Sequence, residues 1–141
     1  MNESMELLNE LYRQSAKESR TLGVLLSNVE NQSLRRDILC QICDCDGVNR
    51  EAGEEITALG EKPKNLPLKD RMSIIGANMS VNGNNSCENI ARIISSESSS
   101  GARKLTHTMN NCINSSPKVY SLARRYVAVA EKSAERMKPY L

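Results

Sequence analysis

The amino-acid sequence contains no phenylalanine and no tryptophan, and its four tyrosines are the only large aromatic residues among 141. Aromatic rings usually supply much of the buried area of a protein core, so aliphatic side chains and methionine must fill this one. Smaller side chains let helices approach closely, but each contributes less free energy of burial. We therefore expect an ordinary or modest stability.

Other features are also missing. No apolar run reaches the ~18 residues that a membrane-spanning helix needs, and residues 1–6 lack the basic and apolar character of a signal peptide. The formal charge of +2 is too small to indicate a nucleic acid or an acidic membrane surface as the partner. Five cysteines, an odd number without an export signal, favour reduced thiols. We expect a cytoplasmic protein.

The spacing of apolar residues predicts an all-α protein with one domain over residues 1–141. Four long helices are expected, at about residues 3–29, 34–59, 86–113 and 117–138. Ser33, Ser86 and Ser116 are the expected N-caps, and Gly60 is the expected left-handed terminator of the second helix. Pro117 fits the first position of the last helix.

Two segments have less regular patterns. Residues 60–85 contain two prolines and an Asn-Gly-Asn-Asn sequence, and we interpret them as a long crossover with a short helix at about 68–79. Residues 95–101 contain five serines and a glycine, which are poor helix formers, so a flexible linker is the alternative there. We favour a helix because the apolar pattern continues in register on both sides.

The buried face of the second helix has an unusual middle. Its predicted seam has the spacing of a helix but carries small or polar residues at its centre: Ile38, Gln41, Cys45, Val48, Ala52, Glu55 and Leu59. Short connections between helices one and two and between three and four place Glu18 level with residue 44, and Glu97 level with residue 133. Carboxylates on a seam are costly unless they are paired, protonated or bound to a cation.

The short, long, short order of connections, together with Leu59, Gly60 and Pro63 at the end of the second helix, resembles the ferritin-like superfamily. The likeness is greatest to small bacterial ferritin-like proteins. It implies an antiparallel four-helix bundle whose long crossover joins helices two and three. In its di-iron members, helices one and three each supply a glutamate, and helices two and four each supply a Glu-x-x-His pair.

On that resemblance, Glu18 and Glu97 match the lone glutamates, and Glu131 matches the glutamate of the last helix. Ala134 stands where its histidine would be, while Cys45 and Val48 stand in place of the other pair. The single histidine, His107, lies about 15 Å along its helix from Glu97. The resemblance thus implies a degenerate di-iron site, whose candidate metal ligands are Glu18, Cys45, Glu97 and Glu131.

The alternatives at these residues remain open. The carboxylates could be satisfied by hydroxyls of Ser15, Ser19 or Ser98, by water or by a basic side chain, or they could bind iron, manganese or zinc. For Cys40, Cys43 and Cys45 the main interpretation is buried or half-buried structural thiols. Oxidation and metal binding are the alternatives, and Cys45 is rotated about 140° from Cys40 on an ideal helix.

No pattern indicates catalytic or cofactor-binding residues, and we expect His107 to be exposed or capped rather than a base. The first functional hypothesis is a non-catalytic bundle that acts as a structural or protein-interaction module, as a homodimer through an apolar helix face or with another protein. The second is an atypical metal-binding or oxidative-stress protein that uses the residual carboxylates. A third is that the cysteines sense oxidation.

Overall fold

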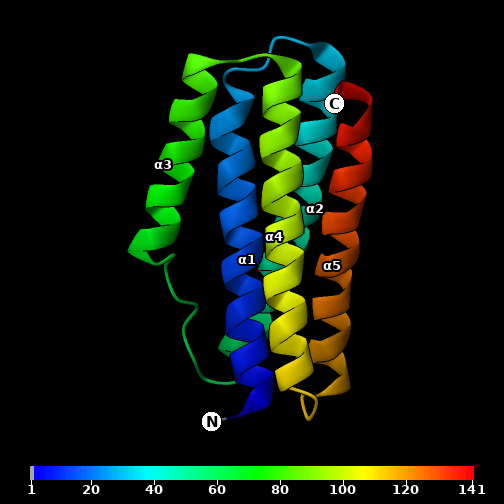
Figure 1. Cartoon of the computed structure of the whole chain (residues 1–141). Helices are drawn as coiled ribbons and strands as arrows, with labels where there is room; N and C mark the ends of the chain where they lie inside the picture. Colours follow the sequence, from blue (N-terminus) through cyan, green and yellow to red (C-terminus); the bar gives the residue numbers. More distant parts are fainter. Residues whose placement is uncertain (1) are drawn as a thin grey trace.

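The computed structural model describes residues 2–141, which form five packed α-helices and a final short 3₁₀ turn (Figure 1). The helices are α1 (Glu3–Leu26), α2 (Gln32–Ala58), α3 (Leu68–Gly83), α4 (Cys87–Asn111) and α5 (Pro117–Met137), and the turn is η1 (Lys138–Tyr140). The all-α prediction is confirmed. In the part of the chain that the structure describes, no helix is long and apolar enough to cross a membrane.

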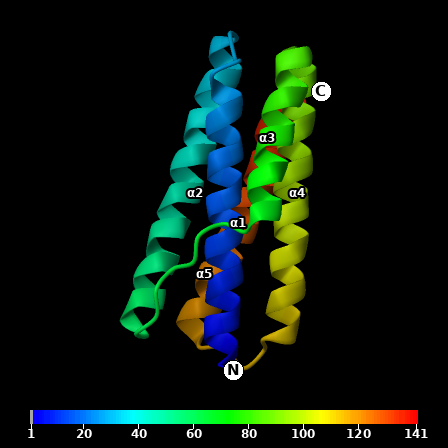
Figure 2. The ribbon, with the colours of Figure 1, turned by 90° about the vertical axis from the view of Figure 1, so that its left-hand side faces the viewer.

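Four of the helices, α1, α2, α4 and α5, run side by side over the height of the molecule (Figures 1 and 2). The pairs α1–α2 and α4–α5 are antiparallel hairpins, and α1 also packs on α4 while α2 packs on α5. The segment after α2 climbs back along the bundle, so α2 and α4 run in the same direction. The predicted order of short, long and short connections is therefore confirmed.

The helix boundaries follow local capping chemistry. Ser86 and Ser116 accept hydrogen bonds from the backbone amides three residues ahead, as predicted, and Gly60 ends α2 with a φ of 85°. The prediction for Ser33 is wrong, because α2 begins earlier and the Asn31 side chain accepts the hydrogen bond from the Leu34 amide. Asparagine caps a helix at least as well as serine, and it stands two residues earlier.

The serine-rich segment is helical throughout, because α4 continues from Cys87 to Asn111 without interruption. Ser98 and Gly101 are buried there and face the core, whereas Ser96 and Ser99 are exposed. Tertiary packing of this face outweighs the low helix propensity of serine. The helical interpretation of residues 95–101 is confirmed, and the linker alternative is wrong.

The crossover places α3 on the outside of α1, next to the upper part of the bundle (Figure 2). This helix is longer than the predicted 68–79, since it continues to Gly83. Ile74 and Val81 are buried on its inner side. Asp70, which is 1% exposed, accepts hydrogen bonds from Nε and Nη2 of Arg13 on α1, at 2.6 and 3.0 Å. This ion pair fixes the inner face of α3 against the bundle.

The core consists of two apolar clusters at different heights. One is built around Leu8, Leu11 and Leu105 and the other around Leu25, Ile38 and Ile94. Between them the buried residues include polar side chains from all four long helices: Glu18, Gln41, Ser98 and Ser133, together with the hydroxyl of Tyr126. This polar layer is the feature of the fold that bears most directly on function.

Candidate functional site

The polar layer is centred on the carboxylate of Glu18, which is only 3% exposed. Tyr126 donates its phenolic hydrogen to Oε1 at 2.6 Å. Nε2 of Gln41 and Oγ of Ser98 donate to Oε2 at 3.0 and 3.1 Å. One carboxylate from α1 thus receives hydrogen bonds from α2, α4 and α5, and each donor is an uncharged group.

Further hydrogen bonds hold these donors in place. The Gln41 amide also donates to the Val129 carbonyl oxygen at 3.0 Å, so both of its amide hydrogens are used. Its Oε1 accepts a hydrogen bond of 2.6 Å from Arg136, whose guanidinium also pairs with Asp44 at 3.2 Å. The hydroxyls of Ser98 and Ser133 share a hydrogen bond of 2.8 Å. Gln41 is therefore fixed from both ends of its amide.

Burial and the nearby Glu18 carboxylate raise the pKa of the Tyr126 hydroxyl well above its usual value. The same two causes strongly raise the pKa of the Cys45 thiol, which is completely buried beside Gln41. Both groups are consequently protonated at neutral pH. A thiol held in this form is a poor nucleophile and a poor metal ligand, because the thiolate is the reactive species.

Gly101 on α4 gives Tyr126 room to reach the carboxylate. A Cβ atom at this position would lie 2.6 Å from the Tyr126 hydroxyl oxygen. That oxygen is held in place by Glu18, and the ring is completely buried, so neither can move aside easily. Gly101 thus leaves the space that the Tyr126 hydroxyl occupies in the polar layer, although glycine weakens a helix.

The structure brings together two of the four candidate metal ligands. Glu18 and Cys45 both lie in the polar layer. Glu97 lies at the edge, where its carboxylate is 3.5 Å from the ammonium of Lys17 and 24% of its side chain is exposed. Glu131 is exposed on the outside of α5. Within residues 2–141, no three His, Cys, Asp or Glu side chains are grouped so that they could hold a metal ion.

Single positions of the predicted buried faces are wrong. On α2, Ile56 is buried rather than the predicted Glu55 and Leu59, and on α4 Ser98 is buried rather than Glu97. On α5, Tyr126 and Ser133 are buried. Both Glu97 and Ser98 fit a helical spacing of three and four residues between Ile94 and Gly101. Ser98 lies four residues after Ile94 and three before Gly101, and all three of these residues are buried.

The alternatives for satisfying the carboxylates are also resolved in part. Ser98 donates to Glu18, as one of the alternatives proposed, and a basic side chain, Lys17, pairs with Glu97. Ser15 instead donates to the Leu11 carbonyl oxygen, and Ser19 donates to Asp46. Among the three donors to the Glu18 carboxylate, Ser98 is therefore the one that the sequence indicated as a partner.

The cysteines are all free thiols, but they differ in exposure. Cys45 and Cys112 are buried, whereas Cys40 and Cys43 are exposed on the outer side of α2. The prediction of buried or half-buried thiols is thus wrong for Cys40 and Cys43, because the inward positions of this helix are taken by Ile38, Gln41 and Cys45. His107 is exposed, as predicted, and shares a hydrogen bond with Asn111.

The fold and the polar layer together define an all-helical bundle whose four long helices are joined by a buried hydrogen-bond network. No protein-family model, curated protein or solved structure matches this chain. Function must therefore be inferred from the residues themselves.

Proposed function

We propose that this chain is a non-catalytic, ferritin-like bundle that acts as a structural or protein-interaction module. The observation that carries the proposal is the polar layer around Glu18. At the height where a metal-binding bundle of this type has several carboxylates and two imidazoles, this chain has one buried carboxylate whose oxygens accept hydrogen bonds from an amide, a hydroxyl and a phenol.

The chemistry of this donor set suits a structural role. Buried polar groups stabilise a unique arrangement of helices when every member of the network has a partner. Gln41 and Tyr126 are both buried, and each would have to give up its hydrogen bond to Glu18 before a cation could approach the two oxygens of that carboxylate. The order of the helix connections supports the ferritin-like description, and the layer supports a function without metal chemistry.

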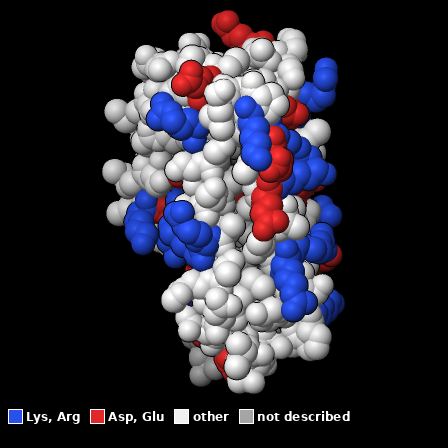
Figure 3. Space-filling model, turned by 45° about the vertical axis from the view of Figure 1, so that its right-hand side comes forward, with Lys and Arg blue, Asp and Glu red and all other residues white. Residues whose placement is uncertain are grey.

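The surface is compatible with a protein partner. Basic and acidic side chains are both present on the face drawn in Figure 3. Two ion pairs join α2 and α5, Lys118 with Glu55 and Arg125 with Glu51. Large apolar side chains are exposed on α3. A binding partner is expected to cover that helix rather than the charged faces of α2 and α5.

The competing hypothesis, metal binding through the residual carboxylates, provides the test. Protein purified without chelator is analysed for iron, manganese and zinc, and its melting temperature is measured with each metal and with EDTA. We expect less than stoichiometric metal and no shift. A ligand at 100 times its Kd would add about 2.7 kcal/mol to the free energy of unfolding, which is easily detected.

Two variants make this test specific. Glu18→Gln keeps the shape of the buried side chain, and Glu54→Gln is the matched change at an exposed position that is not a candidate ligand. Stoichiometric metal that is lost in Glu18→Gln and kept in Glu54→Gln would overturn the proposal in favour of the metal-binding alternative.

A further inference from the structure

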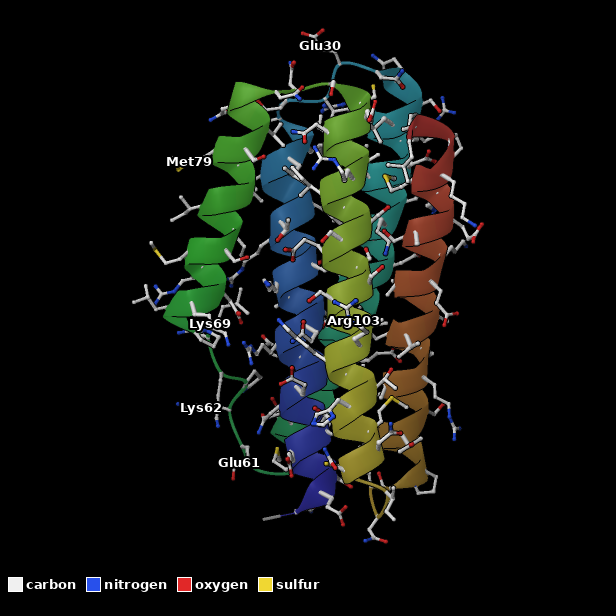
Figure 4. The ribbon with its side chains drawn as sticks, viewed as in Figure 1. Glu30, Glu61, Lys62, Lys69, Met79 and Arg103 are labelled. Carbon is white, nitrogen blue, oxygen red and sulfur yellow. The ribbon has the colours of Figure 1, made fainter. Side chains whose placement is uncertain are left out.

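The outer face of α3 carries a continuous apolar stripe. Four of the eight large hydrophobic side chains that the structure exposes lie on this one helix: Leu68 (65% exposed), Met72 (59%), Ile75 (53%) and Met79 (68%). Their spacing of four, three and four residues places them within an arc of about 60° at 100° per residue. Met79 and Lys69, at the two ends of α3, are labelled in Figure 4. We call these four residues the α3 stripe.

The stripe faces away from the bundle because the opposite face of α3 is fixed. Asp70, Ile74 and Val81 are the buried residues of this helix, and Asp70 is held by Arg13. If α3 rotated to bury the stripe, this ion pair would break and a carboxylate would be exposed in exchange for leucine and methionine. The chain's own fold therefore leaves the stripe without a cover.

We infer, building on the proposed role as an interaction module, that the α3 stripe is a homodimer surface on which α3 helices of two copies pack antiparallel. The stripe is self-complementary in that direction. Its centre lies between Met72 and Ile75, so a two-fold axis there places Met72 against the partner's Ile75, and Leu68 against the partner's Met79. Each large side chain then meets another of similar size.

The charges favour the antiparallel direction. Lys69 and Arg71 flank the stripe near the N-terminal end of α3, and both are exposed. The last turn of α3 contains no basic residue, so the partial negative charge at that end is uncompensated within the helix. An antiparallel pair brings the basic end of each helix beside the C-terminal end of the other. A parallel pair would bring Lys69 beside the partner's Arg71.

Gly76 is consistent with a close approach of two helices at this place. It lies in the middle of α3, is exposed, and a Cβ atom added to it would meet nothing within 4 Å. Glycine in a helix costs about 1 kcal/mol relative to alanine, and the chain's own packing does not require it here. A residue without a Cβ atom beside the centre of the stripe leaves space for a side chain of the second copy.

The interface would be small and the association weak. A helix of 16 residues is about 24 Å long, and a single pair of such helices buries less than the roughly 800 Å² per partner of a standard interface. We therefore expect a dissociation constant above about 1 μM, with a reversible equilibrium between monomer and dimer.

The direct test is sedimentation equilibrium of the full chain from about 1 μM to about 1 mM, the range in which so small an interface dissociates. We expect the mass to rise from 15.7 kDa toward twice that value. Ile75→Lys should raise the dissociation constant at least ~10-fold, because it places a charge at the centre of the stripe. Circular dichroism of each variant establishes that it remains helical.

Ile113→Lys is the matched control. Ile113 is also an exposed isoleucine, at 72%, but it lies in the turn between α4 and α5, away from the stripe. Its substitution should leave the dissociation constant unchanged. A wild-type chain that stays monomeric up to the highest concentration would overturn the inference, as would a dimer that Ile75→Lys does not weaken or that Ile113→Lys weakens equally.

Cross-linking tests the direction of packing. In a background with Cys40→Ser, Cys43→Ser and Cys87→Ser, which removes the thiols that are not buried, a mixture of Leu68→Cys and Met79→Cys chains should cross-link with a short bis-maleimide, whereas each variant alone should not. Cross-linking of each variant with itself would contradict the antiparallel arrangement. Cosedimentation of a monomeric wild-type chain with anionic phospholipid vesicles would assign the stripe to a membrane surface and overturn the inference.

The homodimer inference and the proposed function can fail separately. A monomeric chain that binds no metal would contradict the homodimer inference but agree with the proposed structural role. A chain with stoichiometric metal would remove the proposed function whether or not it dimerises.

Discussion

Two buried carboxylates join helices in this protein by different means. Glu18 is 3% exposed and accepts hydrogen bonds from neutral donors on three other helices. Asp70 is 1% exposed and accepts two hydrogen bonds from one cation, Arg13, on one other helix. The comparison indicates that the first carboxylate supports the whole bundle, while the second supports only the attachment of α3.

The largest effect should come from removing the central carboxylate. Glu18→Ala leaves the donors of Gln41, Ser98 and Tyr126 without their acceptor and creates a cavity between four helices. We expect a loss of about 3–5 kcal/mol in the free energy of unfolding, combining unsatisfied groups with lost packing. Urea denaturation followed by circular dichroism measures it as a single transition shifted to lower urea.

Glu97→Ala is the matched control for that experiment, because Glu97 was predicted to share the central layer but lies at its edge beside Lys17. A partly exposed ion pair of this kind contributes below about 1 kcal/mol. If the two alanine variants were equally destabilised, Glu18 would not be the centre of the bundle.

A smaller and local effect is expected at the attachment of α3. Asp70→Ala leaves the Arg13 guanidinium without its bidentate partner and should cost about 2–3 kcal/mol, since the Arg13 side chain is 27% exposed and can find water. The loss should appear as faster hydrogen exchange within residues 68–83, with exchange in α2 and α5 nearly unchanged. Arg71→Ala, at an exposed position one residue later, should leave exchange unaffected.

The sequence predicted the helices well because their signals are local. Capping serines, a proline at the first helical position and a glycine terminator each act within one turn, and Ser86, Ser116, Pro117 and Gly60 all function as expected. The outer position of α3 was not predicted, because it depends on the ion pair between Arg13 and Asp70, 57 residues apart.

The sequence placed the polar layer at the correct height in the bundle but identified only some of its residues. Glu18 and the Cys45 region are where the lengths of the hairpins placed them. Ser133 and Tyr126 were missed, and Ser98 was named only as one of several alternative partners of the carboxylates, because a shift of one residue changes which side chain of α4 or α5 faces inward. Periodicity determines a helix face within about one residue, and hydrogen-bond partners depend on the remaining rotation.

The smallest expected effect is the response of the Asp70 ion pair to acid. The hydrogen bonds and the charge of Arg13 hold the pKa of Asp70 below its usual value of about 3.9. Because the pKa in the folded state is the lower one, the ion pair contributes its full stabilisation above about pH 4 and loses it as the pH falls below that value. Attachment of α3 should thus be constant from pH 7 to about pH 4.5 and weaken in stronger acid.

The methyl resonances of Ile74, which lies on the inner side of α3, measure this attachment directly. In the wild-type chain they should move only below about pH 4, where Asp70 takes up its proton. In Asp70→Asn, which has no proton to take up at this position, the step below pH 4 should disappear. A step of equal size in both chains would assign the acid response to groups other than the pair of Arg13 and Asp70.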